Sequence, residues 1–302
     1  MIDEKNNAEM ELGTFKYVKQ GVRSESEDKS GSEDKAGMIF NDGFKKQYIE
    51  NYMEESVVHQ NVFDEDKIKT LCEFMFRDTG SWRVSKTGNL FFSGNFRQLV
   101  KDFIRPWTED VLKDTSWDWD KVFTSGGNFF HTPHQYGVHT DMPAPDDHWD
   151  SDLITYKSML IPLYINPGKS KCKMIYYDQR VVDTGCTLDY GPFTSTTHYN
   201  SYTDYTQIKN VYTLDGPTTI DREKTRMLYD DFLRYELDKA PSTIDRYHGL
   251  SVEHSYDWTP GDLHVFDTAQ IHSSTLGTKP QFKTKAGLRI TYMAKRDYAN
   301  YP

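Results

Sequence analysis

The stretch that decides the fold is WTPGDLHVFDTAQIHSS, residues 258–274. A Pro-Gly turn leads into a short strand, LHVF, and a second short strand that carries His272 follows it. Short strands separated by tight turns are typical of antiparallel barrels and sandwiches. A histidine on such a strand can meet ligands from a distant part of the chain at the mouth of a barrel.

A second ligand-rich stretch is HTPHQYGVHTDMP, residues 131–143. Residues i and i+2 of an extended chain point to the same side, so His139 and Asp141 can reach one ion together. By itself this His-x-Asp pair is weak evidence, because it occurs often by chance. With His272 it completes the donor set of a 2-His-1-carboxylate metal site. The sequence therefore predicts metal binding by His139, Asp141 and His272, with His264 as the main competitor to His272.

The third element is GLRIT, residues 287–291, in a strong strand pattern. Arg289 and Thr291 share one face of this strand, and a guanidinium beside a hydroxyl makes a compact carboxylate receptor. The competing interpretation of Arg289 is a surface ion pair. Asn128 and Tyr156, on neighbouring predicted strands, are further candidates for binding the same ligand, with core packing as the alternative for each.

The three elements in this order resemble the Fe(II)/2-oxoglutarate-dependent dioxygenases. The resemblance covers roughly residues 120–295 and implies a double-stranded β-helix (a jelly roll, cupin-like) flanked by N-terminal helices. It also implies Fe(II) at the His-Asp-His set, O2 as oxidant, and 2-oxoglutarate as co-substrate with its far carboxylate on Arg289 and Thr291. The R-x-T pair here is similar to the R-x-S of that family.

The activity implied by this resemblance is decarboxylation of 2-oxoglutarate to succinate coupled to oxidation of a C–H bond. Family members that chlorinate lack the carboxylate ligand, so the presence of Asp141 favours hydroxylation, with desaturation or ring closure as alternatives. We favour a small, amino-acid-derived metabolite as the substrate. A protein side-chain hydroxylase and a non-catalytic cupin-like module that binds a metal or ligand are the competing interpretations.

Composition and charge narrow the class of partner. The chain has 302 residues, of which 36% are hydrophobic and 14% aromatic, and its net charge is −10. An acidic chain without basic stripes is a poor binder of nucleic acids or anionic membranes. No run approaches the ~18 apolar residues of a membrane span, and the three cysteines are scattered. We expect a cytoplasmic protein that binds a small molecule; the oligomeric state stays open.

The order of predicted elements divides the chain. Residues 1–37 are polar and contain the tandem hexapeptides SEDKSG and SEDKAG, which indicates a disordered acidic tail. Residues 38–302 are expected to form a single dioxygenase domain. Helices come first, as a buttress over 38–118, and strands follow in a jelly-roll core over 119–295 with an insertion at about 166–256. Helices before strands, without regular alternation, indicate the α+β class.

Local patterns give the individual elements. Asp64 is expected to cap a helix, Pro106 to kink one, and Pro162 to mark an edge strand or a bulge. The Tyr-rich segment 190–212 is expected to be either a lid or a surface loop. Helices are predicted over 44–55, 64–77, 95–113 and 221–239, and strands over 119–131, 153–165, 172–181, 249–257, 262–267 and 286–294.

Overall fold

The fold is that of a computed structural model, which describes residues 53–77, 82–84, 90–92, 96–132, 138–141, 153–168, 172–181, 211–220, 250–274 and 284–295. The predicted tail (1–37), the predicted helix 221–239 and all but the last two residues of the Tyr-rich segment lie outside these ranges. Residues 53–55, which end the predicted helix 44–55, are irregular, and the rest of that helix also lies outside them.

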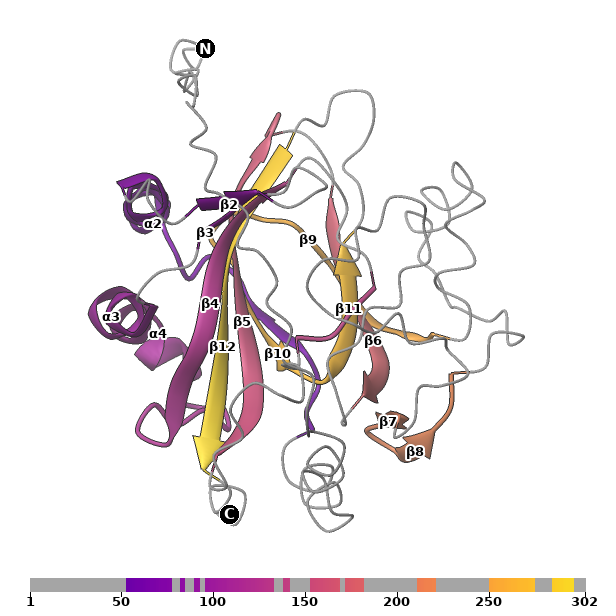
Figure 1. Cartoon of the computed structure of the whole chain (residues 1–302). Coiled ribbons are helices and arrows are strands. Elements are labelled where there is room, and N and C mark those ends of the chain that lie inside the picture. The colour runs from indigo at the N-terminus through magenta and orange to yellow at the C-terminus, as the bar shows by residue number, and fades with distance from the viewer. Residues whose placement is uncertain are drawn as a thin grey trace, which may run out of the picture.

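Two antiparallel sheets face each other (Figure 1). One has seven strands in the order β1 (Val57–His59), β10 (Leu263–Asp267), β5 (Leu153–Asn166), β12 (Thr284–Lys295), β4 (Val122–Thr132), β3 (Leu90–Phe92) and β2 (Trp82–Val84). The other has the order β11 (Gln270–Ser274), β6 (Lys173–Val181), β7 (Val211–Thr213) and β8 (Gly216–Thr218), and β9 (Val252–Asp257) also pairs with β6. This arrangement confirms the predicted jelly roll, although the short strands β1, β2, β3, β7 and β8 were not predicted.

The helices cover the outer face of the seven-stranded sheet (Figure 1). In α2 (Glu65–Arg77), the Asp64 side chain accepts a hydrogen bond from the Lys67 amide at 2.9 Å, which confirms the predicted cap. The predicted helix 95–113 is divided into α3 (Phe96–Leu99), a π-helical turn (Val100–Ile104) and α4 (Arg105–Leu112). The irregular turn therefore ends two residues before Pro106. No helix in the described part of the chain is long and apolar enough to cross a membrane.

Alternate side chains of strand β12 point to opposite faces of the seven-stranded sheet, each of which packs against a different apolar cluster. Ala286, Leu288 and Ile290 are fully buried in the core between the sheet and the helices. Lys285 and Arg289 therefore point to the opposite face, toward the second sheet. The space between the sheets is filled by a second apolar cluster of Phe130, Leu160, Cys172, Met174, Tyr176, Trp258 and Phe266.

Pro162 lies within a central strand. Strand β5 pairs with β10 on one side and β12 on the other, so the predicted edge position is wrong. The predicted bulge is present, because the register with β12 shifts beside the pair of Pro162 and Gly287. The Pro162 carbonyl accepts a hydrogen bond from the Gly261 amide at 3.1 Å, so the irregular strand also anchors the turn before β10.

Substitution of Gly261 tests that turn. Gly261 has a φ of +97°, and an added Cβ would lie 2.5 Å from the Phe63 carbonyl oxygen. We expect Gly261→Ala to lower the free energy of unfolding by about 2–3 kcal/mol, measured by urea denaturation. Gly168→Ala is the matched control, because its Cβ would meet nothing within 4 Å; it should change stability by less than about 1 kcal/mol. Equal effects of the two substitutions would contradict this account of the turn.

Candidate metal centre

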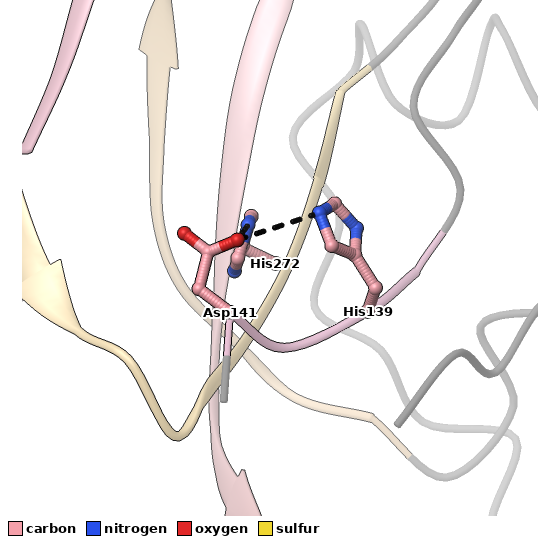
Figure 2. Close-up of side chains that lie close together, drawn as sticks. All are labelled: His139, Asp141 and His272. Carbon is pink, nitrogen blue, oxygen red and sulfur yellow. Dashed lines mark ion pairs between the residues drawn. The ribbon is translucent and has the colours of Figure 1, made fainter. Parts of the chain in front are cut away.

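Three predicted ligands, remote in sequence, meet at one place (Figure 2). The Nε2 atom of His139 lies 4.0 Å from Oδ1 of Asp141, and Nε2 of His272 lies 3.9 Å from the same oxygen. One ligand atom from each residue lies within 4.8 Å of the other two, so a single ion can reach all three. The donor set is two imidazoles and one carboxylate, which suits Fe(II) and leaves coordination positions for other ligands.

Backbone pairing holds this cluster. His139 and His272 exchange two amide-to-carbonyl hydrogen bonds, of 3.0 Å from His139 and 2.9 Å from His272. The Asp141 amide donates to the Thr268 carbonyl at 2.9 Å, in the turn between β10 and β11. Residue 139 is therefore paired with β11, and the ligands come from adjacent segments.

A backbone contact sets the tautomer of His272. Its Nδ1 lies 2.9 Å from the Gln270 carbonyl oxygen, which can only accept a hydrogen bond. Nδ1 therefore carries the proton, and Nε2, which faces Asp141, keeps a free lone pair. The His272 side chain is only 4% exposed, and burial lowers its pKa, which favours the neutral imidazole that a metal requires.

The Asp141 carboxylate is buried among groups that stabilise its charge. Ser158 on β5 donates to Oδ2 at 2.8 Å, and the Arg289 guanidinium donates from Nη1 to Oδ1. Burial alone would raise the pKa of Asp141, but Arg289, His272 and His139 together with the Ser158 hydrogen bond lower it to about 2. Asp141 is therefore ionised at neutral pH and ready to bind a cation.

Of the residues predicted to bind the co-substrate, Asn128 and Thr291 lie near Arg289, whereas Tyr156 packs in the helix-side core. Asn128 on β4 lies beside Arg289 and accepts from its Nε at 3.0 Å, and Thr291 lies on the same face of β12 as Arg289. Tyr156 packs in the helix-side core against Trp117, with ring centroids 6.0 Å apart. A register shift between β5 and β12 adds a residue to β5 near Tyr156, so this side chain does not share the face of Ser158. We therefore do not retain Tyr156 as a co-substrate contact.

Two further ionisable side chains, Lys285 and His264, are buried. Lys285 is fully buried, and its Nζ lies 2.5 Å from Oγ of Ser274 and 3.2 Å from Sγ of Cys172. His264, the competitor to His272, is also fully buried; its Nδ1 lies 3.0 Å from the Tyr176 hydroxyl, and it is not one of the three residues of the metal cluster. Burial lowers the pKa of His264 to about 3, so it is neutral.

Comparisons with known proteins find similarity at low sequence identity, and only among solved structures. No protein-family model matches the chain, and no curated protein matches it. Among solved structures, apo EctD from S. alaskensis has a TM-score of 0.39 and 12% identity over 88% of this chain and 80% of that one. The non-heme alpha ketoglutarate dependent carbocyclase SnoK from nogalamycin biosynthesis has a TM-score of 0.41 and 13% identity over 87% and 88%. EvdO2 from Micromonospora carbonacea var. aurantiaca has a TM-score of 0.41 and 9% identity over 85% and 91%.

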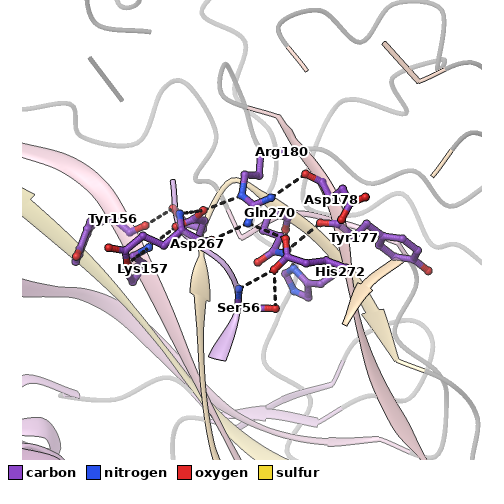
Figure 3. Close-up of polar contacts among 12 residues, drawn as sticks. Ser56, Tyr156, Lys157, Tyr177, Asp178, Arg180, Asp267, Gln270 and His272 are labelled. Carbon is purple, nitrogen blue, oxygen red and sulfur yellow. Dashed lines mark hydrogen bonds and ion pairs between the residues drawn. The ribbon is translucent and has the colours of Figure 1, made fainter. Parts of the chain in front are cut away.

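A buried charge network supports the β10–β11 turn (Figure 3). The Asp267 carboxylate accepts from Lys157 Nζ at 2.5 Å and from Arg180 Nε at 2.8 Å, and all three side chains are buried. Arg180 also donates to Glu253 at 2.9 Å. Burial opposes the charge of Lys157, but Asp267 and Glu54 raise its pKa nonetheless. Asp267 directly precedes Thr268, whose carbonyl oxygen accepts a hydrogen bond from the Asp141 amide. The network therefore stabilises the turn to which the Asp141 backbone is bonded.

Proposed function

We propose that this protein is an Fe(II)- and 2-oxoglutarate-dependent oxygenase that oxidises a C–H bond of a small metabolite. The observation that supports this most strongly is the His139–Asp141–His272 cluster, in which a backbone hydrogen bond directs the free lone pair of His272 toward the carboxylate. The residues fit a divalent transition metal because all three donors converge and Asp141 is buried and ionised. A jelly roll that bound no metal would not require this arrangement.

The residues of the site have separate roles in this proposal. His139, Asp141 and His272 hold the ion, and Ser158 orients the carboxylate from behind. Two cations of β12, Arg289 and Lys285, lie on the face of the strand that points toward the second sheet. The sequence proposes Arg289, with Thr291 and Asn128 beside it, for the distal carboxylate of 2-oxoglutarate. The bound iron and co-substrate supply the oxidative chemistry, in which 2-oxoglutarate gives succinate and CO2.

The apolar cluster between the sheets limits the access of water to the metal cluster. Phe266 lies against His272, with ring centroids 4.8 Å apart, and Tyr176 lies against Phe266 at 5.0 Å. A dry wall around the metal strengthens the electrostatic contacts inside the cavity. We therefore expect substrate to enter on the side where His139 and Arg289 are partly exposed, since 21% of the His139 side chain and 34% of the Arg289 side chain are exposed.

The proposal has a direct spectroscopic test. Adding Fe(II) and 2-oxoglutarate together to the protein without O2 should give a weak purple charge-transfer absorption that neither gives alone. Its absence would favour a cupin-like binding module that uses no 2-oxoglutarate. Once the band is observed, succinate release in the presence of O2 is measured with each member of a panel of metabolites and then of a panel of peptides. Stimulation by peptides alone would replace the small-molecule proposal with that of a protein hydroxylase.

A further inference from the structure

Lys285 and Cys172 form a buried pair between the two sheets. The two residues are 0% and 2% exposed, and Nζ of Lys285 lies 3.2 Å from Sγ of Cys172. The same Nζ lies 2.5 Å from Oγ of Ser274 and 4.7 Å from the centroid of the Trp258 ring. In the described part of the chain, no carboxylate forms an ion pair with this lysine. A lysine amine and a cysteine sulfur are thus held in direct contact away from solvent.

The backbone fixes the positions of both residues. Lys285 lies in the central strand β12, where it pairs with Thr132 on β4 and with Ile165 on β5. Cys172 directly precedes β6 of the other sheet, and its carbonyl oxygen accepts a hydrogen bond from the Trp258 amide at 2.7 Å. The pair is 113 positions apart in sequence. A bond between the two side chains therefore joins the seven-stranded sheet to the sheet of β6 and β11.

Burial makes the Lys285 amine a better nucleophile than that of an exposed lysine. An ammonium without a carboxylate partner is costly to bury, and burial accordingly lowers the pKa of Lys285. A larger fraction of the side chain is then the neutral amine, whose lone pair can attack an electrophile. Ser274 Oγ can accept one N–H of this amine, which leaves the lone pair available to the sulfur of Cys172.

Oxidation turns the cysteine of such a pair into an electrophile. Hydrogen peroxide converts a thiol into a sulfenic acid and water, with formation of an S–O bond and cleavage of the peroxide O–O bond. The amine lone pair then attacks the sulfenic sulfur, so that an N–S bond forms, the S–O bond breaks, and the hydroxide leaves with the amine proton as water. One thiol, one amine and one peroxide thus give one sulfenamide and two waters.

We propose that Lys285 and Cys172 form a redox-dependent cross-linking site, at which hydrogen peroxide creates a reversible sulfenamide bond between the two sheets. The bond closes the loop of residues 172–285 and reduces the conformational freedom of the unfolded chain. Ser274, which contacts Nζ, is two residues beyond His272 on β11, so the bond lies beside the strand that carries this proposed metal ligand. The cross-link does not depend on the proposed oxygenase function.

The first experiment detects the bond by mass spectrometry. Full-length protein with Cys72 and Cys186 replaced by serine retains Cys172 as its one cysteine, so it cannot form an internal disulfide. Hydrogen peroxide, added with a chelator that removes iron, should lower its mass by about 2 Da, and dithiothreitol should restore the mass. A protease digest should contain a peptide pair that joins residues 172 and 285. Cys172→Ser or Lys285→Met in the same background should prevent the mass loss.

Three other outcomes would overturn the proposal. A gain of about 16 or 32 Da on Cys172 beside an unmodified Lys285 would show that the oxidised sulfur does not react with the amine. A disulfide of Cys172 in the native protein, in place of the link to Lys285, would show a different partner. Oxidation of Cys72 before Cys172 would be equally contrary, because burial raises the pKa of Cys72 to about 11 and leaves little of its reactive thiolate.

The second experiment measures the effect of the bond on stability. The peroxide-treated protein should unfold at a urea concentration about 1 M higher than the reduced protein, because a cross-link over a long loop stabilises the folded state. Dithiothreitol should reverse this shift. Cys172→Ser, which nearly preserves the size of the side chain, should show no shift. A linked protein with an unchanged midpoint would contradict a constraint between the sheets. Neither experiment needs metal or 2-oxoglutarate, so failure of this proposal leaves the proposed oxygenase function intact.

Discussion

Asp141→Ala will abolish succinate formation and weaken Fe(II) binding by at least about 100-fold. The carboxylate is buried and ionised, and both imidazoles lie near the same carboxylate oxygen. Its loss therefore removes one of the three proposed ligands, the one that carries a negative charge. Fe(II) affinity is measured anaerobically by calorimetry, and succinate by its release from 2-oxoglutarate. Succinate release at the native rate in this variant would show that Asp141 is not a metal ligand.

A graded variant distinguishes loss of a ligand from general disturbance of the site. Ser158→Ala removes the 2.8 Å hydrogen bond to Oδ2 and leaves all three ligands in place. Loss of an outer hydrogen-bond partner typically reduces metal affinity by about 10–100-fold, so Ser158→Ala should fall between the native protein and Asp141→Ala. If Ser158→Ala binds Fe(II) as weakly as Asp141→Ala, the assumption that Asp141 binds the metal and Ser158 only supports Asp141 is wrong.

Asp267→Asn will destabilise the protein by about 3–5 kcal/mol, the largest stability effect that we expect from one substitution. The change removes the buried carboxylate that both cations contact, so that Lys157 keeps Glu54 and Arg180 keeps Glu253 as partners. Two buried positive charges then share one negative charge fewer, and loss of a partner from a buried ion pair is strongly destabilising. The free energy of unfolding is measured by urea denaturation of the protein without metal, so that any change in metal binding does not contribute.

The matched control is an ion pair at the surface. Asp257 lies 3.6 Å from Lys173 Nζ, and its side chain is 73% exposed, so solvent screens the pair. Asp257→Asn should change stability by less than about 0.5 kcal/mol. Similar effects of the two substitutions would mean that the buried network around Asp267 does not support the turn between β10 and β11.

Two residues of the metal cluster, His139 and Asp141, could be paired from sequence because their geometry is local. A spacing of two places His139 and Asp141 on one side of any extended segment, whatever surrounds them. Alternation likewise places Arg289 and Thr291 on one face of β12, with Lys285 on that same face. The sequence by itself thus determined the donor types, their pairing along the chain and the α+β class with a jelly-roll core.

Other features depend on contacts between strands, and only the tertiary structure decided them. The extra residue in β5 turns Tyr156 into the helix-side core, and pairing on both sides makes β5 a central strand despite Pro162. His264 and His272 lie on adjacent short strands, and only the partners across the sheets show which one faces Asp141. Burial of Lys285 follows in the same way from its contacts with Ser274 on β11 and with Cys172, which directly precedes β6. The environment of a side chain depends on such contacts, which alternation along one strand does not reveal.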